Sequence, residues 1–190
     1  PATPALGFLA RMSHLKGMDL LVDAFILLHK RKTIPAETEL RIAGTTLPDD
    51  QEYIDEQISK LDQAGLRDRY SIRQNITRDE KIQHLRDLTV LSVPTRYPEA
   101  FGLYTVEAMA AGIPMVQPAH GAFPEIIDTT AGGATFTPNT SEALADALEP
   151  WLNDPVHSHT MGLRAHEAVK EHYSIERHAE QILKLLPVPV

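Results

Sequence analysis

Short apolar runs alternate with amphipathic stretches along this chain. The runs at 5–10, 88–93 and 113–116 carry no polar alternation, which is typical of strands buried on both faces of a parallel sheet. Further strands are predicted at 39–43, 70–74 and 134–136.

Between these runs, apolar residues recur at helical spacing. The first predicted helix has its apolar face at Met18, Leu21, Phe25 and Leu28. A charged helix should begin at Pro48 and end near Ala64, and a capping box of Thr77 and Glu80 opens the next helix. The inner face of that helix should consist of Ile82 and Leu85. Later segments predict a helix at 103–111, a short turn at 125–127, and helices near 144–152, 157–172 and 174–186.

Strands that alternate with helices at this spacing imply βαβ units and a doubly wound parallel α/β sheet. In such sheets, ligands bind outside the carboxyl ends of the strands. The loops at 11–17, 44–48, 94–102 and 117–123 each follow a predicted strand. They should therefore lie on one rim of the sheet, and the chemistry should lie there too.

Composition narrows the class of protein. A chain of 190 residues with 43% hydrophobic residues fits one globular domain. A formal net charge of −8 argues against a nucleic-acid surface, so an anionic ligand would need local positive charge. The absence of cysteine excludes disulfides and thiolate metal sites.

The hydropathy of the chain and its first residue indicate its cellular location and its length. No apolar run approaches the roughly 18 residues of a membrane span, and no signal peptide is evident. We therefore expect a cytoplasmic protein. Since the sequence begins with Pro1 and not with Met, we also expect it to be part of something longer.

The stretch from Val93 to Pro114 carries the most specific signal. It passes from an apolar run through a loop containing Gly102 into a helix rich in small residues. Such a strand, loop and helix aim backbone N–H groups and a helix dipole at an anion. Glu99 lies in the loop and Glu107 in the helix, with seven residues between them. A carboxylate at Glu107 could accept two hydrogen bonds from a diol, and a phosphate beside a diol describes a nucleotide.

The motif resembles the signature of the family 4, or group 1, retaining glycosyltransferases. The matching residues are the two glutamates, Phe101-Gly102-Leu103, and the run Ala108-Met-Ala-Ala-Gly-Ile-Pro114. The resemblance implies the GT-B architecture, in which two Rossmann-like domains face each other across a cleft. It covers nearly the whole chain and implies that residues 1–190 form the C-terminal, donor-binding domain. The N-terminal acceptor domain would lie outside this chain.

The loop after the first strand resembles the Arg…Lys-Gly element of that family. Its two cations, Arg11 and Lys16, would hold the donor diphosphate and stabilise it as it leaves, and no other basic pair in the chain is so placed. The resemblance assigns Glu107 to the ribose hydroxyls and places Glu99 near the hydroxyls and the reacting carbon of the donor sugar. The simpler alternatives are two solvated cations, an exposed loop acid and a carboxylate that complements a helix N-terminus.

Backbone groups of the central loop complete the expected donor site. The resemblance points to the segment from Ala100 to Leu103, and in particular to the N–H groups of Phe101, Gly102 and Leu103. Gly44 and the two following threonines could border the nucleotide, and residues 73–76 could contact the base, although plain turns are equally consistent with both segments.

The chain departs from the family pattern at several positions. The family often has a glycine near Gln74-Asn75 and a proline where Tyr104 stands. The loop around His120 matches the family's Gly-Gly-x-Pro-Glu only in part, because Ala122 replaces a glycine. His120 could reach the sugar or simply be solvated. The base and the sugar therefore remain unpredicted.

No metal or other cofactor is expected. The nine histidines do not gather at ligand spacing, and Asp49-Asp50 opens a helix, where acidic residues are favoured electrostatically. By resemblance, Arg11, Lys16 and the helix at Leu103 take over the electrostatic role of a metal.

The predicted function is donor binding in a retaining transferase that moves a sugar from a nucleoside diphosphate to an unknown acceptor. Its partners would be the nucleoside diphosphate sugar and its own N-terminal domain, with no nucleic acid and no membrane span. This domain alone should be inactive. A GT-B nucleotide-sugar epimerase and a nucleotide-binding module without catalysis stay open as alternatives.

Overall fold

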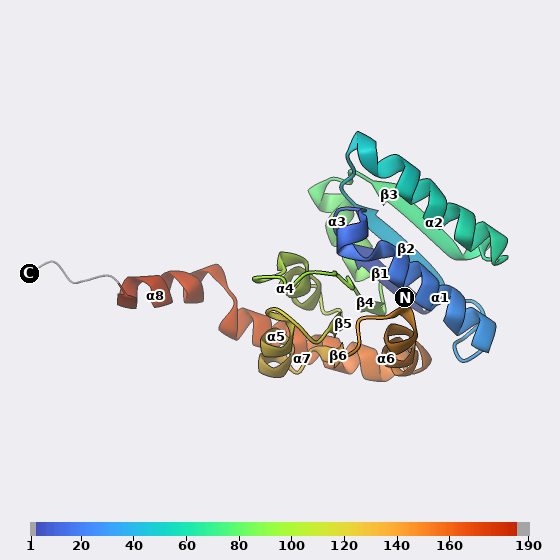
Figure 1. Ribbon diagram of the computed structural model, residues 1–190. Helices are drawn as coiled ribbons and strands as arrows, with labels where there is room; N and C mark the ends of the chain where they lie inside the picture. The colour runs from blue at the N-terminus through green and yellow to red at the C-terminus, as the bar shows by residue number, and fades with distance from the viewer. Residues whose placement is uncertain (1–2, 186–190) are drawn as a thin grey trace, which may run out of the picture.

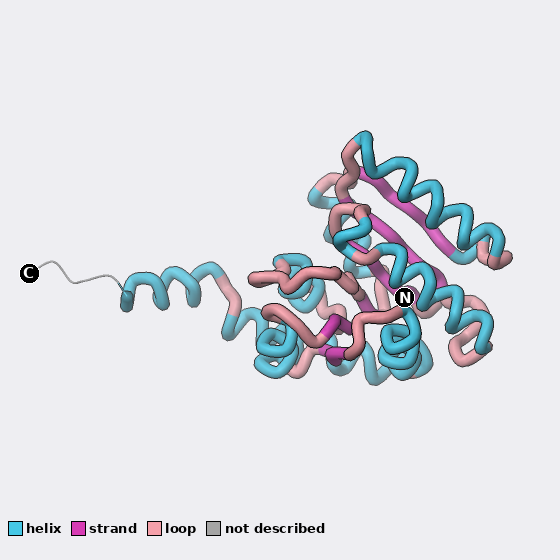
Figure 2. The backbone as a smooth tube through the Cα atoms, in the orientation of Figure 1, coloured by secondary structure: helices cyan, strands magenta, loops and turns pink. Residues whose placement is uncertain are grey.

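A computed structural model describes residues 3–185, which form a six-stranded parallel sheet with helices on both faces (Figures 1 and 2). The strands are β1 (Ala5–Leu9), β2 (Glu39–Gly44), β3 (Tyr70–Gln74), β4 (Val90–Leu91), β5 (Met115–Pro118) and β6 (Gly133–Phe136). Their order is β3-β2-β1-β4-β5-β6. The chain runs outward from β1 to β3 and then returns to β4, so the topological switch point lies between β1 and β4. The predicted doubly wound α/β fold is confirmed.

Eight α-helices connect or follow these strands within the described residues. They are α1 (Met18–Arg31), α2 (Gln51–Gln63), α3 (Arg78–Arg86), α4 (Leu103–Ala110), α5 (Phe123–Thr130), α6 (Ser141–Asn153), α7 (Pro155–His172) and α8 (Ile175–Leu185). Short 3-10 turns occur at η1 (His14–Lys16), η2 (Pro48–Asp50) and η3 (Arg67–Arg69). Right-handed crossovers place α1 and α2 on one face and α3 to α5 on the other. Helix α6 packs beside α1, and α7 packs against α4 and α5.

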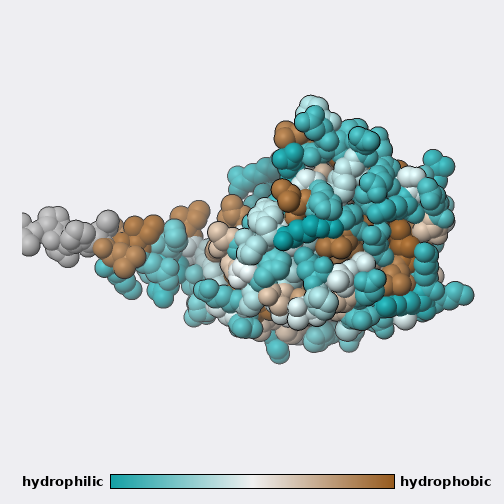
Figure 3. Space-filling model, viewed as in Figure 1, coloured by the Kyte–Doolittle hydropathy of each residue, from teal (hydrophilic) through white to brown (hydrophobic). Residues whose placement is uncertain are grey.

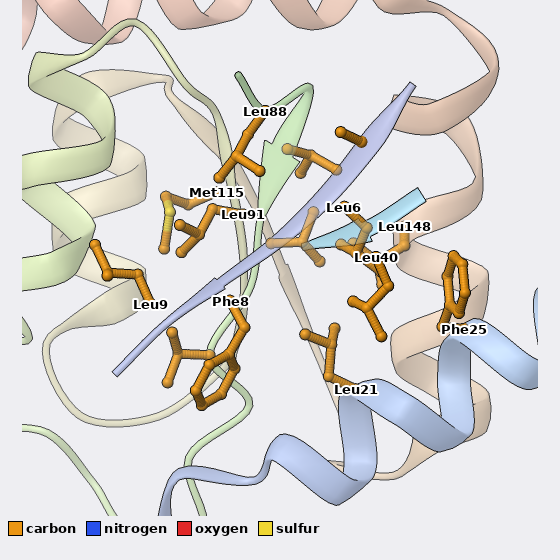
Figure 4. Close-up of a cluster of buried hydrophobic side chains, with 14 of the residues drawn as sticks. Leu6, Phe8, Leu9, Leu21, Phe25, Leu40, Leu88, Leu91, Met115 and Leu148 are labelled. Atoms are coloured by element: carbon orange, nitrogen blue, oxygen red, sulfur yellow. The ribbon is translucent and has the colours of Figure 1, made fainter. Parts of the chain in front are cut away.

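The core is centred on β1, every residue of which is buried. Figure 4 shows Leu6 and Phe8 of this strand among side chains of α1 and the neighbouring strands. All four residues of the predicted apolar face of α1 are fully buried. Burial on both sides of the sheet explains why the β1 run lacks polar alternation.

The capping box at the start of α3 is confirmed. The Thr77 hydroxyl accepts a hydrogen bond from the Glu80 N–H at 3.3 Å, and the Glu80 carboxylate accepts one from the Thr77 N–H at 2.8 Å. The predicted inner face of this helix is only half right. Leu85 is buried, but Ile82 is half-buried, and the second buried place belongs to His84.

Three expected element boundaries need correction. The predicted turn at 125–127 belongs to a full helix, α5, which begins beside Pro124 because proline is tolerated in a first helical turn. In the 88–93 run only Val90–Leu91 is strand, although the Ser92 N–H still donates to Gly7 O at 3.0 Å. The 113–116 strand is shifted to Met115–Pro118.

Helix α8 projects away from the rest of the described chain (Figure 1). It has no buried residue, and Figure 3 shows apolar side chains exposed along it. Among its large apolar side chains, Ile175 and Leu185 are the most exposed, at 84% each. The predicted end of this helix at 186 and the Pro187-Val-Pro189 tail lie outside the described residues. None of the described helices has the length and apolarity needed to cross a bilayer.

Candidate functional site

The loops that follow β1 and β4 meet at the switch point, where α/β sheets bind ligands. A cleft of about 550 Å³ opens there, and its walls come from the ends of β1 and β2 and the starts of α3 and α4. The lining residues are Leu9, Ala10, Arg11, Gly44, Thr45, Ile76, Thr77, Arg78, Lys81, Leu103, Tyr104 and Glu107. We call this space the rim cleft. Four predicted donor residues, Arg11, Gly44, Leu103 and Glu107, thus lie around one cavity.

A larger hollow of about 650 Å³ lies on the other side of Phe101 and Leu103, between α5 and the start of α8. Within the described residues no ion pair joins two of its lining residues, whereas Lys81 and Glu107 of the rim cleft form one. The chemistry of the molecule is therefore concentrated in the smaller cavity and beside it.

Lys16 and Glu99 form an ion pair beside the rim cleft. The Lys16 ammonium donates to Glu99 Oε1, and the Tyr104 hydroxyl donates to the same oxygen at 3.2 Å. The ammonium also lies 4.8 Å from the centre of the Tyr97 ring. Burial alone would lower the pKa of Lys16, but the hydrogen bond to Glu99, the contact with Tyr97 and the charge of Glu99 together outweigh burial and raise the pKa. Lys16 is therefore a cation throughout the physiological pH range, and Glu99 is held by two donors.

The Arg11 guanidinium is held by a second carboxylate. Its Nε and Nη2 atoms each lie 3.0 Å from one oxygen of Asp50, a bidentate contact that leaves Nη1 outside the pair. This hydrogen bonding raises the pKa of Arg11 and lowers the pKa of Asp50. The sequence interpretation of Asp49-Asp50 as a helix opening was incomplete, because Asp50 accepts the Leu47 N–H at 2.7 Å and fixes Arg11 at the same time.

Glu107 pairs with a cation that the sequence analysis missed. Lys81 Nζ, on α3, lies 2.6 Å from Glu107 Oε1, and the two side chains are 32% and 39% exposed. Arg78, one turn earlier on α3, lines the same cleft. The expectation that no other basic pair is so placed was therefore wrong. The capping box that fixes the start of α3 at this rim was the signal that could have placed both residues.

The start of α4 depends on Gly102. This residue has φ 72°, in the left-handed region, and a Cβ atom there would lie 2.9 Å from the Phe123 ring. Among residues 3–185, the amide N–H groups of Phe101, Gly102 and Leu103 donate no hydrogen bond. These donors lie at the positive end of the α4 dipole, close to the Lys16–Glu99 pair. Ala100, which precedes them, is exposed.

The loops after β2 and β3 form the far wall of the rim cleft. Gly44 has no room for a side chain, because a Cβ atom there would lie 1.7 Å from Ala10 O. In the segment expected near a base, Arg73 is tied to Glu80 at 2.7 Å, whereas Ile76 lines the cleft. Ile76 and not Arg73 is thus available to a ligand.

His120 supports the central loop from behind. Its Nε2 atom lies 3.1 Å from Thr95 O, which also accepts a hydrogen bond from the Asn139 amide at 2.9 Å. The Ala122 N–H donates to Glu99 O at 3.0 Å. His120 does not line the rim cleft, so these contacts favour a supporting role over direct contact with a sugar.

No group of three or more acidic or histidine side chains suited to a metal ion occurs in the part of the chain that the structure describes. At the rim cleft, Arg11 pairs with Asp50 and Lys81 pairs with Glu107, one cation to each carboxylate.

Comparison with known proteins identifies the family to which this chain is similar. The model of the family described as "Glycosyl transferases group 1" matches residues 2–168. The chain is 32% identical over 184 residues to the lipopolysaccharide core biosynthesis mannosyltransferase LpcC of Rhizobium leguminosarum bv. viciae, a match that covers 96% of this chain and 50% of that protein. A second relative, LpsB of Rhizobium meliloti, is 32% identical over 187 residues. The chain spans about half the length of these curated relatives.

Solved structures show the same fold. The chain superposes with a TM-score of 0.83 on Anabaena HepE, crystallised with UDP and glucose, at 23% identity over 96% of this chain and 48% of that one. It also resembles the C-terminal domain of LpcC, a group 1 family protein from Francisella tularensis, with a TM-score of 0.75 and 25% identity. That match covers 92% of this chain and 89% of the other.

Proposed function

The chain belongs to the group 1 glycosyl transferases, and we propose that it forms the donor-binding half of a retaining sugar transferase. The donor is a nucleoside diphosphate sugar, and the sugar passes to an acceptor hydroxyl. The bond between the anomeric carbon and the diphosphate breaks, and a bond from that carbon to the acceptor oxygen forms on the same face. The acceptor proton leaves with the diphosphate.

One observation carries this proposal: two cations and two carboxylates from distant parts of the chain meet around the start of α4. Arg11 and Lys16 follow β1, whereas Glu99 and Glu107 follow β4. A diphosphate requires cations and N–H donors, and a ribose or sugar diol is suited to a carboxylate. The HepE structure shows that this fold can hold UDP and a sugar.

The diphosphate would bind between the two cations and the unpaired N–H groups of residues 101–103. Arg11 offers Nη1, and Lys16 offers an ammonium that it shares with Glu99. These donors are already in place before the reaction, so they stabilise the charge that builds up on the leaving diphosphate without reorganisation. Glu99 would take the hydroxyls of the donor sugar.

The nucleoside would occupy the rim cleft itself. Glu107 accepts the two ribose hydroxyls, and Lys81 stays beside it to balance the charge. The base would lie against Ile76 at the wall made by Gly44 and Thr45. Neither base nor sugar is specified by these contacts.

The acceptor would be held by another part of the protein. The relatives are about twice as long as this chain, and we propose that their remaining half corresponds to an N-terminal acceptor domain. Holding both reactants in register can contribute about 7–11 kcal/mol to lowering the barrier. A cytoplasmic location stays a prediction.

Product analysis of a natural protein that contains this domain tests the proposal. The protein is incubated with UDP-glucose or GDP-mannose and a panel of acceptors, and NMR follows the anomeric proton. We expect a glycoside with the donor's anomeric configuration and free nucleoside diphosphate. An isomerised sugar formed without acceptor would identify an epimerase, and binding without any product would identify a nucleotide-binding module. Either result would contradict the proposal.

A further inference from the structure

Arg96 joins two loops that the sheet does not hold together. Its Nη1 and Nη2 atoms lie 2.8 Å and 2.6 Å from the two carboxylate oxygens of Asp19, in a bidentate contact. Arg96 belongs to the loop after β4, and Asp19 to the first turn of α1. The two side chains are only 28% and 15% exposed, so water screens this pair less than an ordinary surface ion pair.

Further hydrogen bonds link the same two segments. The Arg96 N–H donates to Leu15 O at 2.9 Å, and the Thr95 hydroxyl donates to the same carbonyl at 3.1 Å. Arg96 Nη1 also donates to His14 O. Every one of these carbonyls lies in the turn that carries Lys16, and Arg96 lies three residues before Glu99. We call this set of contacts the loop clamp.

Asp19 is fixed from its other side as well. The Tyr53 hydroxyl, on α2, donates to Asp19 Oδ1 at 2.8 Å and accepts the Asp19 N–H at 2.9 Å. Burial would raise the pKa of Asp19, but hydrogen bonds from Arg96 and Tyr53 outweigh it and lower the pKa. The carboxylate therefore stays ionised and has little freedom to turn away from Arg96.

The pairing of β1 with β4 is too short to align the loops that follow these two strands. The paired residues of β1 and β4 are Leu6 with Val90 and Gly7 with Leu91. Beyond that point the two segments approach through Gly17, where a Cβ atom would lie 2.0 Å from Pro94 O. Close packing brings the loops together, and the directional contacts of Arg96, with the hydrogen bond from Thr95 to Leu15, fix how they are aligned.

We propose that Arg96 and Asp19 are positioning residues that hold the Lys16 turn and the Glu99 loop in one alignment across the switch point. This inference rests on the proposed function, because the aligned groups are those that would hold the diphosphate and the donor sugar. The nucleoside end of the cleft, at Glu107, lies outside the clamp. Loss of the clamp therefore weakens recognition of the diphosphate and sugar and spares recognition of the nucleoside.

Calorimetry with three matched ligands tests this. Wild type, Arg96→Ala and Arg96→Lys are titrated with uridine, UDP and UDP-glucose, and in parallel with guanosine, GDP and GDP-mannose. We expect both variants to lose roughly tenfold or more of the affinity ratio of sugar conjugate to nucleoside, the usual loss when a hydrogen bond to a charged group is broken. Lysine should not rescue, because an ammonium cannot make the bidentate contact.

A matched control is available in Arg31, whose guanidinium lies 2.6 Å from Asp146 at the contact of α1 and α6. Arg31→Ala should leave the ratio unchanged. If Arg96→Ala does not fold, Asp19→Asn, which keeps the size of the side chain, replaces it. Equal losses for nucleoside and sugar conjugate, or no loss for either, would overturn the proposal.

A second readout requires no ligand and separates this inference from the proposed function. The side-chain carbon resonances of Lys16 report its pKa, which the contact with Glu99 raises. In Arg96→Ala the pKa should fall toward the ordinary value for lysine, and in Arg31→Ala it should not. An unchanged Lys16 pKa in Arg96→Ala would overturn the positioning role even if every donor binds. Failure of all donors to bind wild type would overturn only the proposed function.

Discussion

Lys16 and Glu99 lie 83 residues apart in the sequence, and their side chains form an ion pair at the switch point of the sheet. The two side chains are 18% and 13% exposed. Because each belongs to a loop that follows a different strand, the pair joins the proposed diphosphate and sugar contacts before any ligand arrives. A donor would therefore enter a site whose charges are already balanced.

Replacement of Lys16 by alanine should weaken binding of a nucleoside diphosphate by about 1.5–3 kcal/mol, the usual range for a hydrogen bond to a charged group. Binding of the bare nucleoside should change much less, because Lys16 does not line the rim cleft. Arg11→Ala should show the same selectivity, although Arg11 lines the cleft, because its Nη1 atom is proposed to contact the diphosphate. Calorimetry with UDP and uridine, or GDP and guanosine, measures both effects, and Lys30→Ala on the exposed side of α1 is the control. Equal losses of affinity for the nucleoside and the nucleoside diphosphate would show that the two cations have a structural role only.

His84 should make the fold sensitive to mild acid. Burial lowers the pKa of His84 to about 4, and its Nε2 atom lies 3.1 Å from Phe8 O. The unfolded chain has the ordinary histidine pKa near 6.5, so it binds the proton first as the pH falls below that value. The contribution of His84 to the free energy of unfolding should drop by about 2 kcal/mol between pH 7 and pH 5.

Urea unfolding at the two pH values measures this change. His84→Gln should lose most of the pH dependence attributable to this residue, and His159→Gln, an exposed position, should keep it. The same dependence in wild type and His84→Gln would show that another group titrates.

Chelation should leave donor binding intact. The proposed diphosphate contacts are the side chains of Arg11 and Lys16 and the N–H groups at the start of α4, which together take the place of a metal ion. Titrations of UDP and GDP with and without EDTA should give the same affinity. A strict requirement for a divalent ion would refute this account of the diphosphate site.

The 190 residues by themselves should bind donor and transfer nothing. They carry the proposed donor contacts, whereas the proposed acceptor domain belongs to the other half of the relatives' length. Without it, the reactants lose the alignment that lowers the barrier by about 7–11 kcal/mol. Incubation with UDP-glucose or GDP-mannose and many acceptors should release no diphosphate. Transfer at an ordinary enzymatic rate would contradict the half-enzyme account.

Much of the fold could be predicted from the sequence, because buried strands and amphipathic helices each have a recognisable spacing of apolar residues. The apolar face of α1 and the capping box of α3 are examples. Helix α5 was predicted only as a turn. Its eight residues are too few to show a clear helical spacing of apolar residues, and the two nearby prolines favour a turn. The spacing of apolar residues does not show which side of a helix packs against the sheet. The sequence therefore predicted Ile82 on the inner face of α3, where the structure has His84.

The site was predicted as a set of residues and not as a set of pairs. The motif brought Glu99 and Glu107 to the rim. It could not show that Glu99 pairs with Lys16, Glu107 with Lys81 and Arg11 with Asp50. Such pairs depend on how loops from different strands align, which no single stretch of sequence encodes. Lys81 was overlooked for the same reason.

The most direct test of the donor site is the affinity of a nucleoside diphosphate for wild type and for Glu107→Gln. The substitution keeps the size of the side chain and removes the charge that strengthens both hydrogen bonds to the ribose. The control is Glu167→Gln, which removes a carboxylate from an exposed pair with Lys170 on α7. Calorimetry with UDP and GDP should show binding to wild type and to the control, and a loss of about 1.5–3 kcal/mol in Glu107→Gln with its melting temperature preserved. Unchanged affinity in Glu107→Gln would contradict the placement of the donor in the rim cleft.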